Sequence, residues 1–244
     1  MIIWAHRGAR RQAPENTLPA FRRAIELGAE GVEFDVQLSA DGVPVVIHDE
    51  TLERTTDGRG RVVDHTLAEL RALDASAGKP GFPGVVIPTL DEVLAVFAPT
   101  ELAVNIELKN SVVDYPGLEE AVLAAVASHG LDRRVVLSSF NADSVARLQG
   151  LTSIPRALVY ERLLRRPWVL AARLGAVAVH PPSRFVVSRG YVTRAHQAGL
   201  AVRTWTVNSE RELRRMYHCG VDGVFTDVPD VALAVRDQLD GSLT

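Results

Sequence analysis

The chain has 244 residues, 47% of them hydrophobic and 23% charged, with a formal net charge of -3 at pH 7. This balance is typical of a globular protein and gives no electrostatic reason to expect a nucleic-acid partner, and the single cysteine, Cys219, excludes an internal disulfide. No apolar stretch approaches the length of a membrane span, and the strand-like start at Ile2 leaves no room for a secretory signal, so we expect a cytoplasmic protein without stable membrane association.

A short apolar strand followed by an amphipathic helix repeats along the chain. Strand patterns cover residues 2–6, 31–38, 101–109, 134–140, 154–160, 175–181, 201–208 and 220–227. Helix patterns cover residues 18–28, 89–97, 117–130, 141–149, 187–199, 209–220 and 228–239. This α/β alternation predicts parallel strands, and eight strands in a chain of this length favour a closed (β/α)8 TIM barrel over the alternative, an open doubly wound sheet. We expect one domain over residues 1–244.

Two segments interrupt this rhythm after the second strand. Residues 43–49, VPVVIHD, follow that strand too closely to be its parallel neighbour. About 40 residues then pass before the next helix pattern, which is far longer than an ordinary strand-to-helix loop. Turn residues cluster at 54–60 and 80–84. We therefore predict a small, irregular insertion at about 49–88, with one short helix at 66–73.

Acidic side chains gather where two of the strands end. Because side chains alternate between the faces of a strand, Glu33 and Asp35 share one face of GVEFDVQL, and Glu107 lies with Asn105 and Lys109 on one face of AVNIELKN. Anions placed together in a barrel mouth need a cation or a proton to neutralise them. The alternatives are an ion-pair network and a divalent cation, and all-oxygen ligands favour Mg²⁺, Mn²⁺ or Ca²⁺ over zinc.

Basic and titratable side chains end the neighbouring strand patterns. His6 and Arg7 follow the first strand, and His48 ends VPVVIH in the same way. In a barrel these positions lie at the catalytic end. A cation, Arg7 and Lys109 can hold a phosphate ester, and two imidazoles can move protons at neutral pH. His180, at the end of GAVAVHP, is a further candidate, and a structural role is the alternative for each histidine.

A series of short motifs spans nearly the whole chain in order. They are HRG at His6, ENT at Glu15, EFD at Glu33, HD at His48, RTT-G-G from Arg54 to Gly60, ELK at Glu107, SF at Ser139, WTVN at Trp205 and TD-P at Thr226. This series resembles that of the glycerophosphodiester phosphodiesterase family. The resemblance implies a TIM barrel with a short insertion after the second strand, a divalent cation, and cleavage of glycerophosphodiesters to glycerol 3-phosphate and an alcohol.

The resemblance also implies roles for particular residues. Glu33, Asp35 and Glu107 would bind one divalent cation, Mg²⁺ or Ca²⁺, with Mn²⁺ as a third choice. His6 and His48 would be the general acid and base, Arg7 and Lys109 would hold the phosphate, and Trp205 would line the site. Glu15 and Asn16 are further candidates, although Asn16 and Thr17 could simply cap the first helix.

Three functions are compatible with this pattern. The first is a metal-dependent phosphodiesterase that takes a small glycerophosphodiester and belongs to glycerol and lipid metabolism. A lysophospholipase D-like activity at the same site is the second. The third is a non-catalytic barrel that binds phosphorylated ligands. The retention of two histidines, three acids and two cations at strand ends favours an enzyme. The preferred alcohol, the native cation and a homo-oligomeric state are left open by the sequence.

Overall fold

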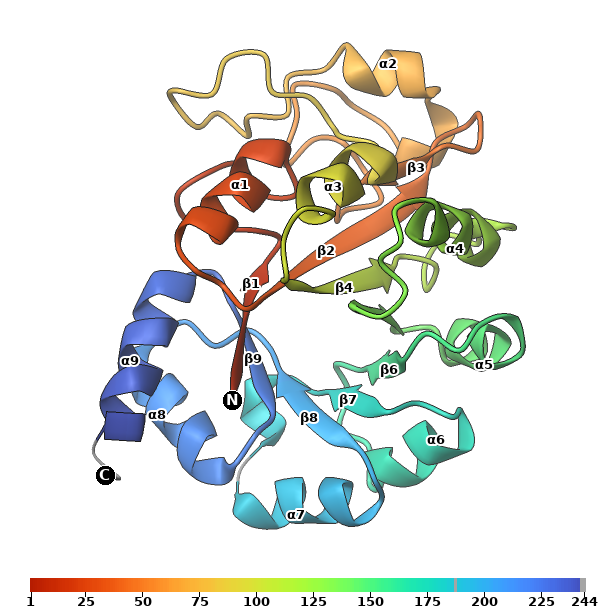
Figure 1. The fold of residues 1–244 in the computed structure, drawn as a ribbon. Helices are drawn as coiled ribbons and strands as arrows, with labels where there is room; N and C mark the ends of the chain where they lie inside the picture. The colour runs from red at the N-terminus through yellow and green to blue at the C-terminus, as the bar shows by residue number, and fades with distance from the viewer. Residues whose placement is uncertain (187, 242–244) are drawn as a thin grey trace.

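The computed structural model describes residues 1–186 and 188–241, and its centre is a closed barrel of parallel strands (Figure 1). The barrel strands are β1 (Ile2–His6), β2 (Gly31–Leu38), β4 (Ala103–Leu108), β5 (Val135–Ser139), β6 (Arg156–Val159), β7 (Ala178–His180), β8 (Ala201–Thr204) and β9 (Gly223–Thr226). The first strand, β1, pairs with both β2 and β9, and these two pairings close the ring. The predicted (β/α)8 barrel is confirmed.

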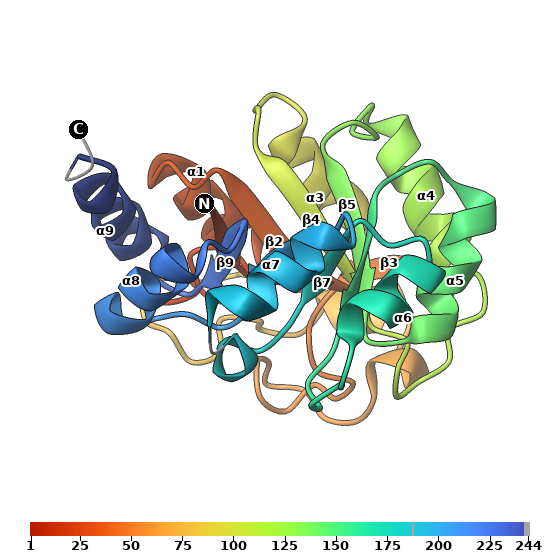
Figure 2. The same cartoon turned by 90° about the horizontal axis from the view of Figure 1, so that it is seen from below.

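Helices surround the barrel on its outer side (Figure 2). They are α1 (Leu18–Glu26), α3 (Leu90–Phe97), α4 (Leu118–Ser128), α5 (Ala142–Leu151), α6 (Pro167–Arg173), α7 (Arg189–Gln197), α8 (Glu210–Cys219) and α9 (Pro229–Gly241), with a 3-10 turn at Ser183–Phe185. The sequence pattern for α7 began at residue 187, which lies outside the described residues. Among those described, no helix is both long and apolar enough to cross a bilayer.

The alternation of side chains along β2 explains how the barrel separates its core from its site. Val32, Phe34 and Val36 point outward and are fully buried in the large apolar cluster under the helices. Phe34 packs on Phe21 of α1 and Phe97 of α3, with ring centroids 5.5 and 6.3 Å apart. The intervening side chains therefore point into the barrel, where the sequence places acids instead of apolar residues.

The residues after β2 form a compact insertion beside the barrel. Strand β3 (Pro44–Val46) pairs antiparallel with β2, as its short connection requires. A 3-10 turn (Val62–Asp64) and α2 (Leu67–Arg71) follow, and Thr66 caps α2 in a reciprocal box with Glu69. The helix predicted at 66–73 is thus present but shorter.

A small apolar cluster of its own holds this insertion together. Its buried members are Val45, Ile47, Leu52, Val62, Leu70, Ala75 and Ile87. Strand β3 supplies the first of these side chains, so the insertion packs directly against the end of the barrel at β2. This contact places the residues after β3 beside the catalytic end of the ring. The division of the chain into one domain stays a prediction.

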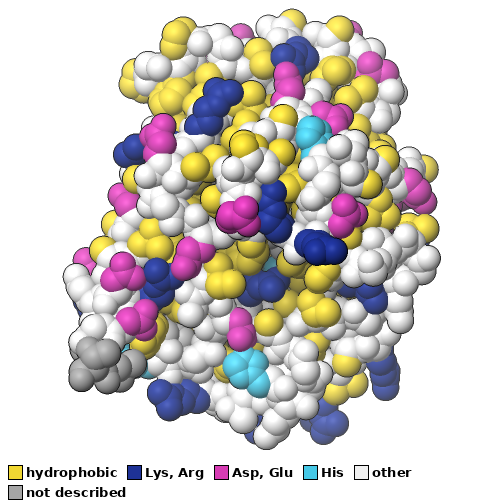
Figure 3. Space-filling model, in the orientation of Figure 1, with side chains coloured by type: hydrophobic (Ala, Val, Ile, Leu, Met, Phe, Trp, Pro, Cys, Tyr) yellow, Lys and Arg dark blue, Asp and Glu magenta, His cyan; other side chains and the backbone are white. Residues whose placement is uncertain are grey.

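The face of the molecule drawn in Figure 3 carries acidic and basic side chains scattered among apolar ones. No wide area of a single sign appears on this face, in keeping with the near balance of 27 basic and 30 acidic residues. The chemically distinctive groups lie instead at the carboxyl ends of the strands.

Candidate active site

A pocket of about 790 Å³ opens at the carboxyl ends of the barrel strands. Its lining includes every residue that the sequence placed in a metal-binding, catalytic or phosphate-binding role: His6, Arg7, Glu33, Asp35, His48, Glu107, Lys109 and Trp205. His180 lies in the same lining. Active sites of this architecture form where strand ends converge, so the pocket is the candidate active site.

Strand register brings the three acids together inside the barrel. Asp35 of β2 lies opposite Glu107 of β4, and Glu33 lies opposite His6 of β1. One carboxylate oxygen from each of Glu33, Asp35 and Glu107 lies within 4.8 Å of the others. Asp35 is 1% exposed and Glu33 is 5% exposed, so bulk water does little to screen their repulsion.

The electrostatics of these acids fit a cation site. Burial and the nearby charges of Asp35 and Glu107 raise the pKa of Glu33 well above its usual value. Burial also raises the pKa of Glu107 despite the opposing effect of Lys109. Burial acts to raise the pKa of Asp35 too, but His48, Arg7 and Lys109 hold it below its usual value. Three convergent carboxylates, two of them buried and that of Glu107 partly buried, form an oxygen donor set that suits a hard divalent cation.

Each candidate catalytic histidine is oriented by a carboxylate. His6 Nδ1 lies 2.7 Å from Oδ1 of Asp227, and His48 Nδ1 lies 2.5 Å from Oδ1 of Asp49. Burial acts to raise the pKa values of both aspartates, but hydrogen bonds from His6 to Asp227, and from Arg54 and His48 to Asp49, hold these pKa values below the usual value. An ionised carboxylate only accepts hydrogen bonds, so Nδ1 of each histidine carries the donated proton and Nε2 is the nitrogen left for chemistry.

The free nitrogen of His6 faces the acid cluster. Its Nε2 lies 4.0 Å from Oε2 of Glu33. Burial lowers the pKa of His6, although its hydrogen bond to Asp227 acts in the opposite direction. A neutral imidazole with its Nδ1 proton held by Asp227 is ready to accept a proton at Nε2.

Two cations lie beside the acids, each held by a carboxylate. Arg7 donates from Nη1 to Glu15 Oε1 at 2.7 Å, and its Nε lies 3.4 Å from Asp35 Oδ2. Lys109 Nζ donates to Glu107 Oε1 at 3.2 Å. Arg7 has a φ of 57°, a left-handed backbone conformation that a non-glycine side chain rarely adopts. Such strain concentrates at functional sites, where it fixes the direction of a side chain.

Arg54 of the insertion donates hydrogen bonds to two carboxylates of the site, those of Glu15 and Asp49. Its Nη1 and Nη2 donate to the two oxygens of Glu15 at 2.9 and 2.8 Å. Its Nε and Nη2 donate to the two oxygens of Asp49 at 2.5 and 2.9 Å. One guanidinium therefore supports both the partner of Arg7 and the partner of His48.

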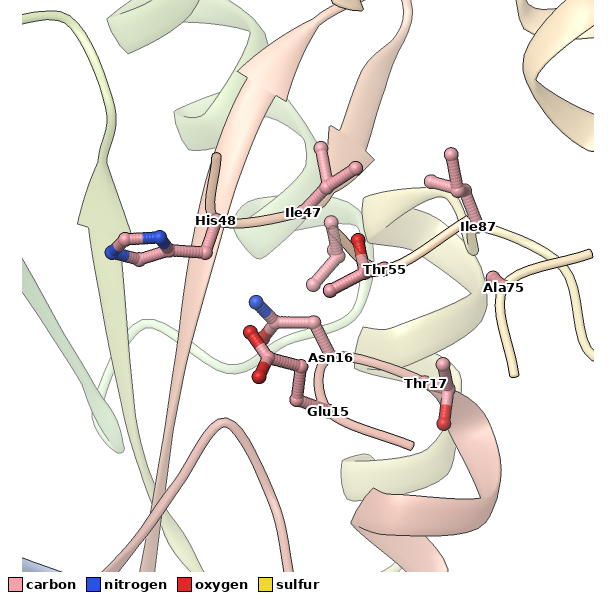
Figure 4. A pocket seen from close by; sticks show the side chains of 9 residues that line it. Glu15, Asn16, Thr17, Ile47, His48, Thr55, Ala75 and Ile87 are labelled. Atoms are coloured by element: carbon pink, nitrogen blue, oxygen red, sulfur yellow. The ribbon is translucent and has the colours of Figure 1, made fainter. Parts of the chain in front are cut away.

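A second, small pocket lies between the barrel and the insertion (Figure 4). Glu15, Asn16 and His48 are among its lining residues. The side chain of Asn16 is 3% exposed and donates from Nδ2 to Asp35 Oδ2 at 2.9 Å. Thr17 stands at the start of α1, but its side chain makes no capping hydrogen bond. Asn16 thus supports a carboxylate of the acid cluster, and Thr17 occupies the N-cap position of α1 without a capping bond from its side chain.

His180 and Trp205 form part of the opposite wall of the larger pocket. Trp205 donates from Nε1 to the backbone oxygen of His180 at 2.8 Å, and its ring lies edge-on to Phe140. His180 is 1% exposed, and burial together with Arg203 lowers its pKa well below the usual value. Its Nε2 has no hydrogen-bond partner among the described residues. His180 is therefore a neutral polar group at the edge of the site.

Three residues that orient the site were given no role from the sequence: Asp49, Arg54 and Asp227. Asp49 directly follows His48, and a carboxylate next to a strand-end histidine was the signal that could have found it. Asp227 is 221 positions from His6, and only the closure of the barrel by β1 and β9 brings the two together. Nothing local in the sequence predicts the path that places Arg54.

Comparisons with known proteins agree with this geometry. The profile of the Glycerophosphoryl diester phosphodiesterase family matches residues 6–231. The chain belongs to this family. A glycerophosphodiester phosphodiesterase of Caldanaerobacter subterraneus is 42% identical over 95% of this chain and 96% of its own length. One from Bacillus altitudinis is 40% identical over 97% of this chain and 98% of its own length.

Solved structures of glycerophosphodiester phosphodiesterases have the same barrel. One from Agrobacterium tumefaciens superposes with a TM-score of 0.85, at 32% identity over 96% of this chain and 99% of its own. A phosphodiesterase of Oleispira antarctica superposes with a TM-score of 0.87, at 33% identity over 97% of both chains. That protein was solved in complex with its product, sn-glycerol-3-phosphate. Membership of this family makes the chain a phosphoric diester hydrolase.

Proposed function

We propose that this chain hydrolyses glycerophosphodiesters to sn-glycerol 3-phosphate and an alcohol, in a reaction that needs a divalent cation. The observation that carries the proposal is the meeting, in one pocket, of a three-carboxylate cluster and two histidines whose Nδ1 atoms are each held by an aspartate. The first part of that set suits a cation, and the second suits proton transfer. The product complex of the Oleispira antarctica relative supports the choice of product.

His6 and His48 supply general acid and base catalysis in this proposal. One Nε2 takes the proton from the attacking oxygen, of water or of a neighbouring glycerol hydroxyl, as it bonds to phosphorus, and the other gives a proton to the alcohol oxygen as its bond to phosphorus breaks. If the glycerol hydroxyl attacks, water then opens the cyclic phosphate to give glycerol 3-phosphate. Asp227 and Asp49 keep each ring in the tautomer that leaves Nε2 available. Because both histidines work in one proton-transfer cycle, removing either one interrupts the same reaction.

Arg7 and Lys109 hold the phosphate. Both side chains are paired with a carboxylate at the edge of the acid cluster, so an anion that enters there meets two positive charges. Arg7 contributes a guanidinium that can bind two phosphate oxygens at once, and Lys109 contributes a point charge. Trp205 forms a wall of the pocket, and Glu15 and Asn16 hold Arg7 and Asp35 in place.

Glu33, Asp35 and Glu107 would hold the cation, for which we propose Mg²⁺ or Ca²⁺, with Mn²⁺ as a third choice. When bound, a divalent cation stabilises the negative charge that develops on the phosphate oxygens. Its charge would also favour the ionised form of Glu33, whose pKa is raised by burial and by the charges of Asp35 and Glu107. The three acids are stability liabilities without such a charge, because each desolvated anion lies beside the others.

The cation proposal is tested by metal depletion. Chelation of the purified protein should abolish release of glycerol 3-phosphate from glycerophosphocholine, and Mg²⁺, Ca²⁺ or Mn²⁺ should restore it. Asp35→Asn should raise the cation concentration needed for half-maximal activity and leave the barrel folded. Asp64→Asn is the matched control, because Asp64 is 60% exposed and lies in the insertion. Undiminished activity in metal-free protein would overturn the proposal.

A comparison of substrates distinguishes the alternatives. Turnover of water-soluble glycerophosphodiesters above that of lysolipids supports the proposed substrate class, whereas the reverse order favours the lysophospholipase D-like activity. Binding of glycerol 3-phosphate without turnover of any diester would indicate the non-catalytic barrel. We also propose a cytoplasmic location, for which fractionation of cells that express the tagged protein is the test.

A further inference from the structure

The loop between β6 and α6 carries a dense group of unpaired positive charges. Arg162, Arg165 and Arg166 lie within five positions and are all exposed. None of the three side chains has a hydrogen bond or an ion pair with any described residue. Glu161 is the only acid between residues 156 and 174. A chain with a net charge of -3 therefore has a locally basic surface at this loop.

The same region exposes large apolar side chains. Leu163 is 77% exposed and Val112, in the loop after β4, is 75% exposed. The next most exposed large hydrophobic side chain among the described residues is Leu151, at 46%. These two side chains are thus the most exposed large apolar groups of the described part of the chain. Leu163 lies directly between the basic residues of the loop.

Both loops border the candidate active site. Val112 and Arg162 line the pocket that contains His6, His48 and the acid cluster. Figure 2 shows the loop that leads into α6 reaching toward the same side of the molecule as the insertion. Leu163, Arg165 and Arg166 follow Arg162 within four positions of the same loop, so the basic and apolar groups lie next to the pocket. We call Val112, Arg162, Leu163, Arg165 and Arg166 the mouth rim.

The rest of the loop is anchored, which holds the rim residues outward. Leu164 and Trp168 pack against the large apolar cluster on this side of the barrel. Trp168 lies edge-on to Tyr191 of α7, with ring centroids 5.9 Å apart. Pro167 begins α6 and is buried. With its neighbours at 164, 167 and 168 fixed in the protein, Leu163 points to solvent as a consequence of the fold.

We propose that the mouth rim docks reversibly on an anionic lipid bilayer. Arginines beside exposed aliphatic side chains match a membrane surface, because the cations meet anionic headgroups while the aliphatic groups enter the interface. Charge complementarity selects a negatively charged surface, and the small apolar area makes the contact weak and reversible. This surface contact differs from the stable membrane association that the sequence argues against.

Docking at this rim has a consequence for the substrate class. The candidate active site would face the bilayer, so a glycerophosphodiester that remains in the membrane through one acyl chain could present its phosphate to the pocket. This extension rests on the proposed function, since it assumes that the pocket hydrolyses glycerophosphodiesters. Vesicles that contain a lysolipid would then be better substrates when they also contain an anionic lipid.

Sedimentation with vesicles tests the docking surface. We expect the protein to sediment with vesicles of phosphatidylglycerol and phosphatidylcholine at low salt, to bind pure phosphatidylcholine much less, and to dissociate as salt rises. The pair R165E/R166E should weaken binding by at least about tenfold. The control R22E/R211E reverses the same charge at two exposed residues of α1 and α8 and should leave binding within about twofold.

A second pair of variants tests the apolar part. L163S should weaken vesicle binding several-fold, whereas L151S, at an exposed leucine of α5, should not. The proposal would be overturned if the mouth-rim variants and the control variants lost vesicle binding equally. It would also be overturned if the protein did not bind anionic vesicles at low salt. Dimerisation of the protein that R165E/R166E abolishes would overturn it as well, because the rim would then be covered by a second copy of the chain.

Turnover of a soluble substrate distinguishes a failure of the docking surface from a failure of the proposed function. R165E/R166E should hydrolyse glycerophosphocholine within about twofold of the wild type, because these two arginines do not line the pocket. Soluble turnover without vesicle binding would disprove the docking surface alone. Vesicle binding without soluble turnover would disprove the proposed function.

Discussion

The two sides of the active site hold their histidines by different means. On the barrel side, His6 is 13% exposed and its partner Asp227 comes from the end of β9, the strand that closes the ring against β1. On the insertion side, His48 is 31% exposed and its partner is the next residue, Asp49, which Arg54 braces. The first pair depends on global folding and the second on local charge contacts.

This difference predicts different costs for the same kind of substitution. A change on the barrel side removes contacts that are also part of the closed ring, so stability and activity should fall together. A change on the insertion side removes contacts between partly exposed charges, which contribute little to stability. There, activity should fall while the fold remains.

Removal of the histidines themselves should have the largest effect. His6→Ala and His48→Ala should each lower kcat by roughly 10²–10⁴-fold, as expected for a lost general acid or base. The double variant should fall much less than the product of the single effects, because both groups act in one cycle. Steady-state kinetics measure both quantities. A kcat within a few-fold of the wild type for His6→Ala, with reduced thermal stability, would show that His6 is structural.

Removal of Arg54, which holds Asp49 on the insertion side, should have the next largest effect. Arg54→Ala leaves Asp49 and Glu15 without their shared donor, so kcat should fall about 10–100-fold, while Tm should fall by only a few degrees because the side chain of Arg54 is 45% exposed. Added guanidinium should restore part of the lost activity, because the missing group is a planar cation. Arg61→Ala is the control, since Arg61 lies in the insertion, its side chain is 55% exposed, and among the described residues that side chain forms an ion pair only with the exposed Asp64. Equal responses of the two variants would contradict the role of Arg54.

The two carboxylates should differ most in their effect on stability. Asp227 also accepts from Asn208 at 2.8 Å and is 9% exposed, so Asp227→Asn should lower Tm by about 4 °C or more as well as lowering kcat. Asp49→Asn should lower kcat with a Tm change below about 2 °C. Thermal unfolding of both variants tests this asymmetry, and equal Tm losses would remove the distinction between the two sides.

The smallest expected effect is a dependence of stability on acid pH. Burial acts to raise the pKa of Glu15, but the hydrogen bonds and charges of Arg54 and Arg7 lower it from 4.5 to about 2. An acid with a lowered folded-state pKa contributes stability that is complete above the unfolded-state value and is lost as pH falls toward the folded-state value. Wild type should therefore lose its Tm advantage over Glu15→Gln between about pH 5 and pH 2. A constant difference in Tm over that range would contradict this prediction.

The same contrast explains what the sequence could predict. Period-two alternation is a local property, so Glu33, Asp35 and Glu107 could be assigned to one face of their strands, and strand register then brings them within 4.8 Å. The barrel followed from the count of strands and helices. By contrast, Asp227 meets His6 only through ring closure, and Arg54 meets Glu15, 39 positions away, only because the irregular turns after β3 bring it back to the barrel. Such contacts depend on tertiary structure and have no periodic signal.

The length of α2 also could not be predicted fully from the sequence. Its pattern suggested residues 66–73, whereas the helix runs from Leu67 to Arg71. Thr66 and Glu69 form the capping box that begins it, which a sequence motif can reveal. The chain leaves the helix after Arg71, and Ala75 then donates its backbone N–H to Val85 and joins the insertion's apolar cluster. This long-range contact has no signal in the helix pattern.

Leaving-group dependence in the two histidine variants tests the central claim most directly. Glycerophosphocholine needs a proton on its departing alcohol, whereas a p-nitrophenyl ester of glycerol 3-phosphate does not, because p-nitrophenolate leaves unprotonated. If His6 and His48 divide acid and base catalysis, one alanine variant should recover most of its activity on the aryl ester and the other should remain impaired on both substrates. Equal losses on both substrates for both variants would contradict the division of roles.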